Sequence, residues 1–146
     1  MFYLTFSKRK TFVILLLVNL CLFAFVVLTA FKDRGVRLNN PTLRIKYLEE
    51  QGYRIDTNFS EEIKVMTLPT EFSDVYKNYN QLQKQNGFDL EKYKGFEVTR
   101  YTLKVFDENN RNDLYCHIYL HNGYLIGGDV ATTAIDGYMK GLKNAS

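Results

Sequence analysis

The longest uninterrupted stretch of apolar side chains lies near the start of the chain, at residues 11–31. It carries no charge, and its only polar members are Asn19 and two threonines. As a helix rising about 1.5 Å per residue, it would be roughly 30 Å long, which matches the hydrocarbon core of a bilayer. We therefore expect a transmembrane helix over residues 11–31, preceded by a basic tail (residues 1–10) and followed by a linker (residues 32–40).

Three other interpretations of residues 11–31 are less favourable. A cleaved signal peptide has a shorter apolar stretch of about 7–15 residues and a small-x-small site, whereas Leu28-Thr29-Ala30 begins with a large residue. A lipoprotein signal needs a small residue before its cysteine, and Leu20 precedes Cys21. A buried core helix normally keeps a polar stripe. A membrane anchor is favoured, and cleavage stays the open alternative.

Basic residues flank the apolar segment on both sides, so charge alone does not decide its orientation. Three precede it at residues 8–10, and more follow it: Lys32, Arg34, Arg37, Arg44 and Lys46. Long segments translocate largely regardless of charge, and a basic start followed by an apolar run has the layout of an export signal. We expect a single-pass protein of the cell membrane, with a cytoplasmic tail and an extracytoplasmic domain over residues 41–146.

Beyond the linker, the pattern first predicts a helix and two short strands. Asn40 can cap a helix that begins at Pro41, because proline suits the first helical position, and Gly52 supplies a stop. The strands are expected at Tyr53–Asp56 and Ile63–Leu68.

The clearest helix is expected over Thr70–Asn86, where apolar side chains recur at helical spacing. They are Phe72, Val75, Tyr76, Tyr79 and Leu82. Thr70 can cap this helix and Gly87 ends it. Its tyrosines could form a stacking platform, but core packing is preferred because an amphipathic helix needs such a face to cover a core.

Three strands follow a connector at residues 89–95: Phe96–Phe106, Leu114–His121 and Tyr124–Val130. Asn122-Gly123 is a strong hairpin signal between the last two, because both central turn positions need a positive φ. We therefore expect an α+β domain in which two helices pack on an antiparallel sheet. Its order is helix, strand, strand, helix and three-stranded meander.

The two-residue turn also predicts which side chains share a face of the sheet. It pairs His121 with Tyr124, Leu120 with Leu125, Ile118 with Gly127 and Cys116 with Asp129. One face is then apolar, with Leu103 and Val105 of the preceding strand, and we expect helix Thr70–Asn86 to pack there. The opposite face is too aromatic for plain solvent surface and too polar for a deep core. It carries Tyr115, His117, Tyr119, His121 and Tyr124.

Asp129 is the most interesting single residue, because this register places its carboxyl group on the apolar face, where an unpaired charge is costly. The neighbouring Gly127-Gly128 is typical of a bulge that would rotate Asp129 outward. A bulge or a cap is preferred over a catalytic acid. His117 and His121 would lie about 13 Å apart on a strand, too far to share a metal ion. No phosphate loop, nucleophile elbow, zinc spacing or dinucleotide fingerprint is present, and we expect no cofactor and no metal.

Charge and cysteine content exclude two further classes of protein. The chain has 19 Lys and Arg against 16 Asp and Glu, but five of the basic residues and Asp33 flank the apolar segment. The remaining 14 basic and 15 acidic residues leave the domain nearly neutral, without the basic face that a nucleic-acid binder needs. Cys21 lies in the apolar segment and Cys116 in a predicted strand, so a disulfide-stapled scaffold is not expected.

Several segments of the domain resemble a known family. The likeness lies in residues 47–53, 68–76, 79–90, 93–95, 98–101, 126–130 and 136–142. The sequence is similar to a domain of unknown function catalogued under the number 4830, from Gram-positive bacteria of the Firmicutes type. This resemblance implies a small envelope protein with an N-terminal membrane segment, and it implies no activity, ligand or catalytic residue. Members often carry a cysteine after the Gly-Gly-Asp-Val run, where this chain has Ala131.

The leading hypothesis is a non-enzymatic binding or interaction module on the outer face of a bacterial membrane. Its partners would be the membrane, through residues 11–31, and a protein or another envelope component, but not nucleic acid. The candidate binding residues are Tyr115, His117, Tyr119, Tyr124, Arg100 and Asp129. One alternative is an envelope hydrolase that uses Asp129 with Arg100 or a histidine. A second is an inhibitory or propeptide-like domain for a secreted protease.

Overall fold

The computed structural model of the chain describes residues 13–24, 35–133 and 137–143. Contacts divide the chain into two units, Met1–Arg34 and Gly35–Ser146. In the first unit, residues 13–24 are helical. Among the residues described, no helix combines the length and the apolar character needed to cross a membrane. The rest of the predicted anchor, the basic tail and residues 32–34 of the linker lie outside the described residues.

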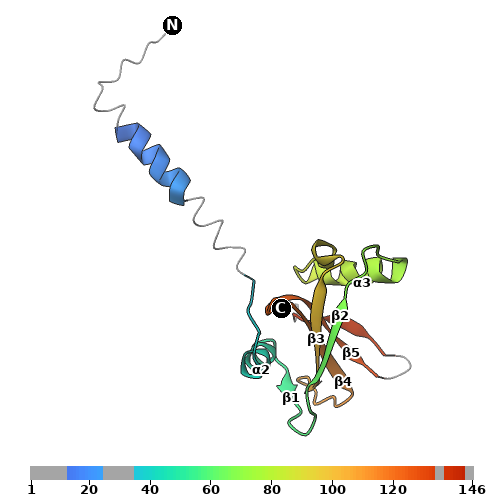
Figure 1. Cartoon of the computed structure of the whole chain (residues 1–146). Coiled ribbons are helices and arrows are strands. Elements are labelled where there is room, and N and C mark those ends of the chain that lie inside the picture. The colour runs from blue at the N-terminus through green and yellow to red at the C-terminus, as the bar shows by residue number, and fades with distance from the viewer. Residues whose placement is uncertain (1–12, 25–34, 134–136, 144–146) are drawn as a thin grey trace. The chain divides into compact units, whose positions relative to one another are not determined.

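The second unit is an α+β domain built around an antiparallel sheet, as the sequence pattern predicts (Figure 1). The predicted order of helices and strands is confirmed. A short 3-10 helix, η1, and a short strand, β6, add to it. The elements are α2 (Pro41–Glu50), β1 (Arg54–Ile55), β2 (Glu62–Thr67), α3 (Asp74–Gln85), η1 (Leu90–Tyr93), β3 (Glu97–Phe106), β4 (Leu114–His121), β5 (Tyr124–Thr132) and β6 (Met139–Gly141).

The sheet runs in the order β1-β3-β4-β5-β6, with every neighbouring pair antiparallel. β2 lies beside β3 on the same side as β1, because β1 pairs with the end of β3 and β2 pairs with its beginning. The Asn122-Gly123 turn joins β4 and β5, and both residues have a positive φ, of 51° and 81°. The predicted hairpin is therefore confirmed.

The register of this hairpin changes after two residue pairs. His121 pairs with Tyr124 and Leu120 with Leu125, as predicted. A β-bulge then inserts Ile126, and the next pairs are Tyr119 with Gly127, Ile118 with Gly128, His117 with Asp129 and Cys116 with Val130. The predicted pairs Ile118–Gly127 and Cys116–Asp129 are wrong, because one extra residue exchanges the two faces of the strand beyond it.

This exchange places Asp129 on the same face as His117 and Tyr119. The predicted bulge does rotate the carboxyl group away from the Cys116 face, but it lies before Gly127 rather than at the glycine pair. Glycine is needed at 128, since a Cβ there would meet the carbonyl oxygen of His117 at 2.6 Å and Leu142 Cδ2 at 2.7 Å. The bulge thus sets which side chains reach Asp129.

The two faces of the sheet have separate cores. α2 packs with the Cys116 face, where Tyr47 and Leu48 join a buried cluster that includes Leu103, Cys116 and Ile118. α3 and η1 belong to the opposite face. Their cluster contains Phe72, Leu90, Val98 and Ile126, with Tyr76, Tyr79 and Tyr119 packed against it. Helix 70–86 therefore does not pack on the Cys116 face, and that prediction is wrong, because α2 covers this face instead.

α3 begins four residues later than predicted. Its N-cap is Ser73, whose side chain accepts a hydrogen bond from the backbone N–H of Tyr76. The face turned toward the sheet differs from the predicted stripe: Asn80 and Gln83 are buried. Val75, which belongs to that stripe, is 78% exposed. The amide of Gln83 bonds both backbone groups of Gly128, so polar contacts hold the helix against β5.

Candidate functional site

Asp129 is the centre of a buried polar cluster between α3 and the sheet. Its side chain is 1% exposed. The Tyr79 hydroxyl donates a hydrogen bond to one carboxyl oxygen at 2.5 Å, and Nδ1 of His117 contacts the other oxygen at 2.9 Å. A buried carboxyl group is costly unless it is hydrogen-bonded, and here both of its oxygens have partners.

Three elements bring these groups together. Asp129 on β5 and His117 on β4 are directly paired across the hairpin, so their side chains leave the sheet on the same side. Tyr79 comes from the second turn of α3. Since Gly127 carries no side chain, α3 can approach β5 closely: a Cβ there would meet Gln83 Oε1 at 2.9 Å.

Tyr119 and Arg100 extend this arrangement, and we call the set Tyr79, Arg100, His117, Tyr119 and Asp129 the Asp129 cluster. Arg100 lies opposite Tyr119 in the β3–β4 register and forms a hydrogen bond with its hydroxyl group. The rings of Tyr79 and Tyr119 meet edge to face, with centroids 6.2 Å apart. The buried Nε of Arg100 has no hydrogen-bond partner among the described residues.

Both tyrosines of the cluster keep their protons at physiological pH. Burial, and then the negative charge of Asp129, raise the pKa of the Tyr79 phenol far above its ordinary value. The pKa of Tyr119 is also raised, first by burial and then by Asp129, against the opposing effect of its hydrogen bonds with Tyr79 and Arg100. The two hydroxyl groups therefore act as hydrogen-bond donors held in fixed positions.

A groove of about 430 Å³ lies against the two tyrosines. We call it the tyrosine groove, and it is lined by Val75, Tyr76, Asn78, Tyr79, Leu82, Tyr119 and Met139. No charged side chain lines it. Val75 and Met139 are both exposed there. The groove thus has a mostly apolar lining. The hydroxyl groups of its two tyrosines are held by hydrogen bonds within the Asp129 cluster.

A second cavity, of about 970 Å³, has a mixed polar and apolar lining and lies beside the loop after β3 and the β6 end of the sheet. Lys140 and Lys143 line it together with Asp107 and Glu108. Charges of both signs border this cavity, so it does not select one sign of ligand, and none of the candidate binding residues lies in it.

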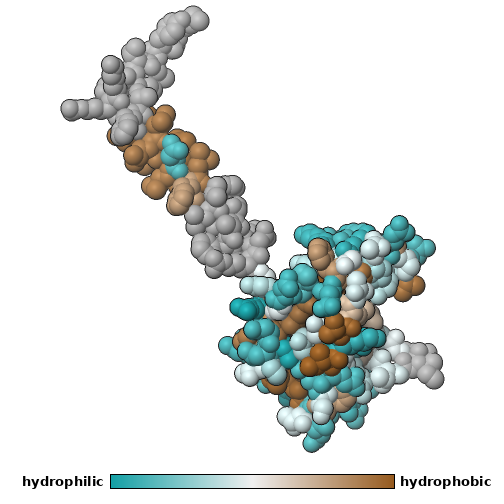
Figure 2. Space-filling view, viewed as in Figure 1, coloured by the Kyte–Doolittle hydropathy of each residue, from teal (hydrophilic) through white to brown (hydrophobic). Residues whose placement is uncertain are grey.

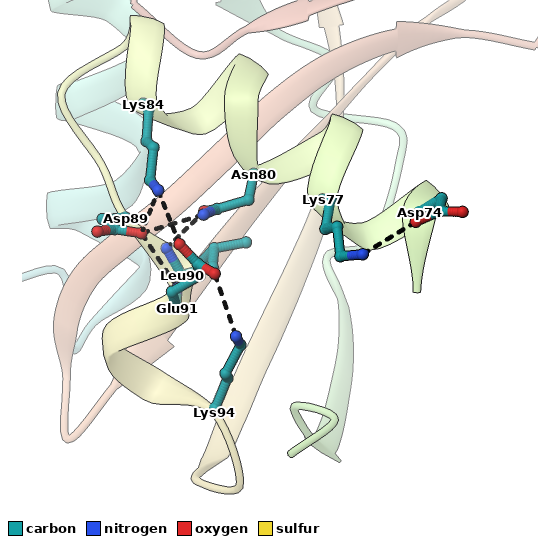
Figure 3. Close-up of polar contacts among 8 residues, drawn as sticks. All are labelled: Asp74, Lys77, Asn80, Lys84, Asp89, Leu90, Glu91 and Lys94. Carbon is teal, nitrogen blue, oxygen red and sulfur yellow. Dashed lines mark hydrogen bonds and ion pairs between the residues drawn. The ribbon is translucent and has the colours of Figure 1, made fainter. Parts of the chain in front are cut away.

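A network of polar contacts fixes α3 to η1 (Figure 3), and none of its residues lines the tyrosine groove. The buried side chain of Asn80 donates to Asp89 and accepts from the backbone N–H of Leu90, at 3.0 Å and 2.8 Å. Lys84 reaches both Asp89 and Glu91, and Lys94 also binds Glu91. This network is structural: it holds the helix that carries Tyr79 in place.

The structure brings together four of the six candidate residues, namely Arg100, His117, Tyr119 and Asp129. Tyr115 lies farther along β4, where its ring packs edge to face against Phe59. Tyr124 lies exposed at the hairpin turn, with the guanidinium carbon of Arg37 5.9 Å from its ring centroid. These two residues are outside the Asp129 cluster and outside the tyrosine groove.

Tyr79 of the Asp129 cluster is absent from the sequence-based candidates, and so are Asn80 and Gln83, which hold its helix in place. Tyr79 is part of the apolar stripe of its helix, and nothing local distinguishes it from a core residue. Asn80 and Gln83 recur with Tyr76 and Tyr79 at helical spacing, and this spacing is the signal that could have placed them on the buried face.

Within the described part of the chain, no group of three or more His, Cys, Asp or Glu side chains is placed to hold a metal ion. Cys116 is fully buried on the other face, and burial, followed by the charge of Asp129, raises the pKa of its thiol well above the ordinary value. It is therefore unsuited to act as a thiolate nucleophile.

Comparison with known proteins places the chain in a family. No curated protein and no solved structure matches it. One family model matches residues 47–130, which run from the last turns of α2 to β5 and include the whole Asp129 cluster. The chain belongs to the family described as Domain of unknown function (DUF4830).

Proposed function

We propose that this protein is a non-enzymatic binding module, anchored to a bacterial membrane by residues 11–31, whose tyrosine groove receives an apolar side chain of a partner protein. The observation that carries the proposal is the hydrogen bond between the Tyr79 hydroxyl and the buried carboxyl group of Asp129. Through this bond, the buried Asp129 cluster fixes the orientation of a tyrosine ring that lines the groove.

Fixed aromatic rings suit a binding surface. A side chain that is already held in one orientation loses little conformational freedom when a partner binds, which leaves more of the contact energy as affinity. Tyrosine is enriched among the residues that dominate protein interfaces. Tyr79 and Tyr119 are both held through their hydroxyl groups and present ring surface to the groove.

The lining of the groove defines the chemistry of the occupant. It has no charged side chain to pair with a charged ligand. Val75 on α3 and Met139 on β6 expose apolar surface at the same place, and methionine adapts to side chains of different shape. An aliphatic or aromatic side chain on a partner polypeptide satisfies these conditions.

The membrane part of the proposal rests on the sequence of residues 11–31, and the extracytoplasmic placement on its resemblance to an export signal. A reporter enzyme fused after Ser146 tests the placement. We expect activity from a reporter that works only outside the cytoplasm. Activity only from a cytoplasmic reporter would reverse the orientation.

Photocrosslinking from the full chain in its membrane tests the groove. A benzophenone amino acid at position 75 points into the groove, while the same group at position 81 lies on the exposed side of α3. We expect position 75 to give a crosslink that mass spectrometry assigns to an apolar segment of one partner protein, and position 81 to give none. Crosslinks to lipid or to a small molecule, or equal crosslinks from both positions, would contradict the proposal.

The geometry also supports a second function, an envelope hydrolase. A buried carboxyl group at Nδ1 of a histidine is the arrangement that orients a general base in catalytic triads, and His117 with Asp129 has it. Thr102, buried and directly opposite His117 on β3, offers a hydroxyl group on the same face of the sheet. Ester hydrolysis that is lost in His117→Ala and kept in His121→Ala would favour this function over binding. We expect no such turnover.

A further inference from the structure

β2 is an edge strand whose outer side is unpaired. It bonds to β3 on one side, and no other described strand pairs with it. Five of its six residues are exposed, and the sixth, Met66, is partly exposed. Figure 1 shows β2 crossing the front of the domain, and Figure 2 shows hydrophobic atoms exposed in the same place.

The backbone groups that point outward can be assigned from the register. The N–H of Leu68 donates to the carbonyl of Phe96, so Leu68 belongs to a hydrogen-bonded pair of the antiparallel ladder. Such pairs alternate along a strand, which assigns Glu62, Lys64 and Met66 to the bonded set. The N–H and C=O groups of Ile63, Val65 and Thr67 therefore face away from β3, where a further strand could bind.

The side chains along this edge are complementary to those of a second copy of the same strand. Ile63 and Val65 are 61% and 58% exposed on one face. Glu62 and Lys64 lie on the other face, and neither has an ion-pair partner among the described residues. Lys64 instead lies directly opposite Arg100, and like charges in that position are unfavourable.

We propose that a second copy of this chain pairs with β2 in antiparallel fashion, about a two-fold axis at Ile63, and continues the sheet. In this register Ile63 faces its own symmetry mate. Glu62 of each copy faces Lys64 of the other, which gives each unpaired charge a partner and offsets the repulsion between Lys64 and Arg100.

The other registers that keep each face continuous are less favourable. An axis at Lys64 places two lysines opposite each other. An axis at Val65 places Lys64 opposite Met66 and Glu62 opposite Leu68, which leaves both charges unpaired. A lysine in an edge strand normally discourages pairing, and only the Ile63 axis supplies the glutamate that neutralises it.

Disulfide trapping of the full chain in detergent tests the register, in a Cys21→Ser background that leaves only the buried Cys116. Across the proposed axis, the Ile63 Cα atoms would be about 5.5 Å apart, within disulfide range. The Val65 Cα atoms would be about 14 Å apart, because they are offset by four residues along neighbouring strands. We expect Ile63→Cys to form a covalent dimer under mild oxidation and Val65→Cys, equally exposed, to stay monomeric. A dimer from Val65→Cys, or none from either variant, would overturn the proposal.

A charge swap tests the ion pairs without new cysteines. Sedimentation of the full chain in detergent gives the dimer dissociation constant. We expect Glu62→Lys or Lys64→Glu alone to raise it about tenfold, because two cross-strand ion pairs become two repulsions. The double variant, Glu62→Lys with Lys64→Glu, should restore it. A double variant as weak as the single ones, or a native chain that does not self-associate, would contradict the proposal.

Discussion

The two faces of the sheet are both covered by a helix, but they are stabilised in different ways. Beneath α2, the buried side chains form an apolar cluster, and the buried polar residue on this side is Arg44, which bonds Glu61 and the backbone of Leu38. Beneath α3, the helix instead contacts the sheet through polar groups: Gln83 bonds the backbone of Gly128, and Tyr79 bonds Asp129. Hydrogen bonds are directional, whereas the hydrophobic effect is not, and the groove lies on the α3 face.

The largest effect is expected on the apolar α2 face. Leu48 is fully buried, and Leu48→Ala should lower the free energy of unfolding by about 2–5 kcal/mol, through lost burial and the cavity left behind. Urea denaturation of the full chain in detergent measures this change. A loss below 1 kcal/mol would show that α2 contributes little to the core.

Gln83→Leu should have the largest effect on the α3 face. Leucine keeps most of the volume, but the N–H and C=O of Gly128 lose their partners in a buried position, at a cost of about 1–3 kcal/mol. Gln81→Leu, on the exposed side of the same helix, is the matched control and should leave stability unchanged. Equal effects from the two variants would mean that the amide contacts do not hold α3 in place.

Removal of a single hydroxyl group should change the free energy of unfolding differently on the two faces. Tyr79→Phe leaves the buried carboxyl of Asp129 with one partner fewer, and we expect a loss of about 1–3 kcal/mol. Tyr47→Phe on the α2 face should be neutral or slightly stabilising, since the buried Tyr47 hydroxyl has no hydrogen-bond partner among the described residues. The reverse order in denaturation would contradict the assigned hydrogen bonds.

Alkaline pH should destabilise the folded domain gradually. Burial raises the pKa of Tyr47 from 10.0 to about 12, and it raises the pKa of Tyr79 further still. A raised pKa in the folded state means that stability is fully present below pH 10 and is lost as pH rises through the folded pKa values. Stability measured from pH 9 to pH 12 should therefore fall, and Tyr79→Phe should fall less steeply than the native chain. Parallel curves would show that Tyr79 does not contribute.

The two faces also differ in how well the sequence predicts which side chains lie on them. Strict alternation along β3 and β4 correctly placed Leu103, Val105, Cys116 and Ile118 together. The opposite face depends on one inserted residue, Ile126, and alternation carries no information about the position of a bulge. Asn80 and Gln83 are buried and their amide groups are hydrogen-bonded. The sequence alone does not show those partners, so it predicts such residues on the surface.

The candidate site was likewise predicted in part. Arg100, His117, Tyr119 and Asp129 were singled out for their chemistry, and the structure joins them. Tyr79 was missed because it comes from a helix fifty positions away along the chain, and only the packing of α3 on the bulged strand brings it near. The family match assigns the chain to a family, but the description of that family names no activity.

The crosslinking yield from position 75 in a Tyr79→Phe background tests most directly whether the Asp129 cluster prepares the groove for a partner. Without the hydroxyl group, the ring is no longer held by Asp129. We predict that the yield falls several-fold in Tyr79→Phe while Tyr47→Phe, on the other face, leaves it unchanged. Equal yields from the two backgrounds, with the domain folded in both, would contradict a binding role for the cluster.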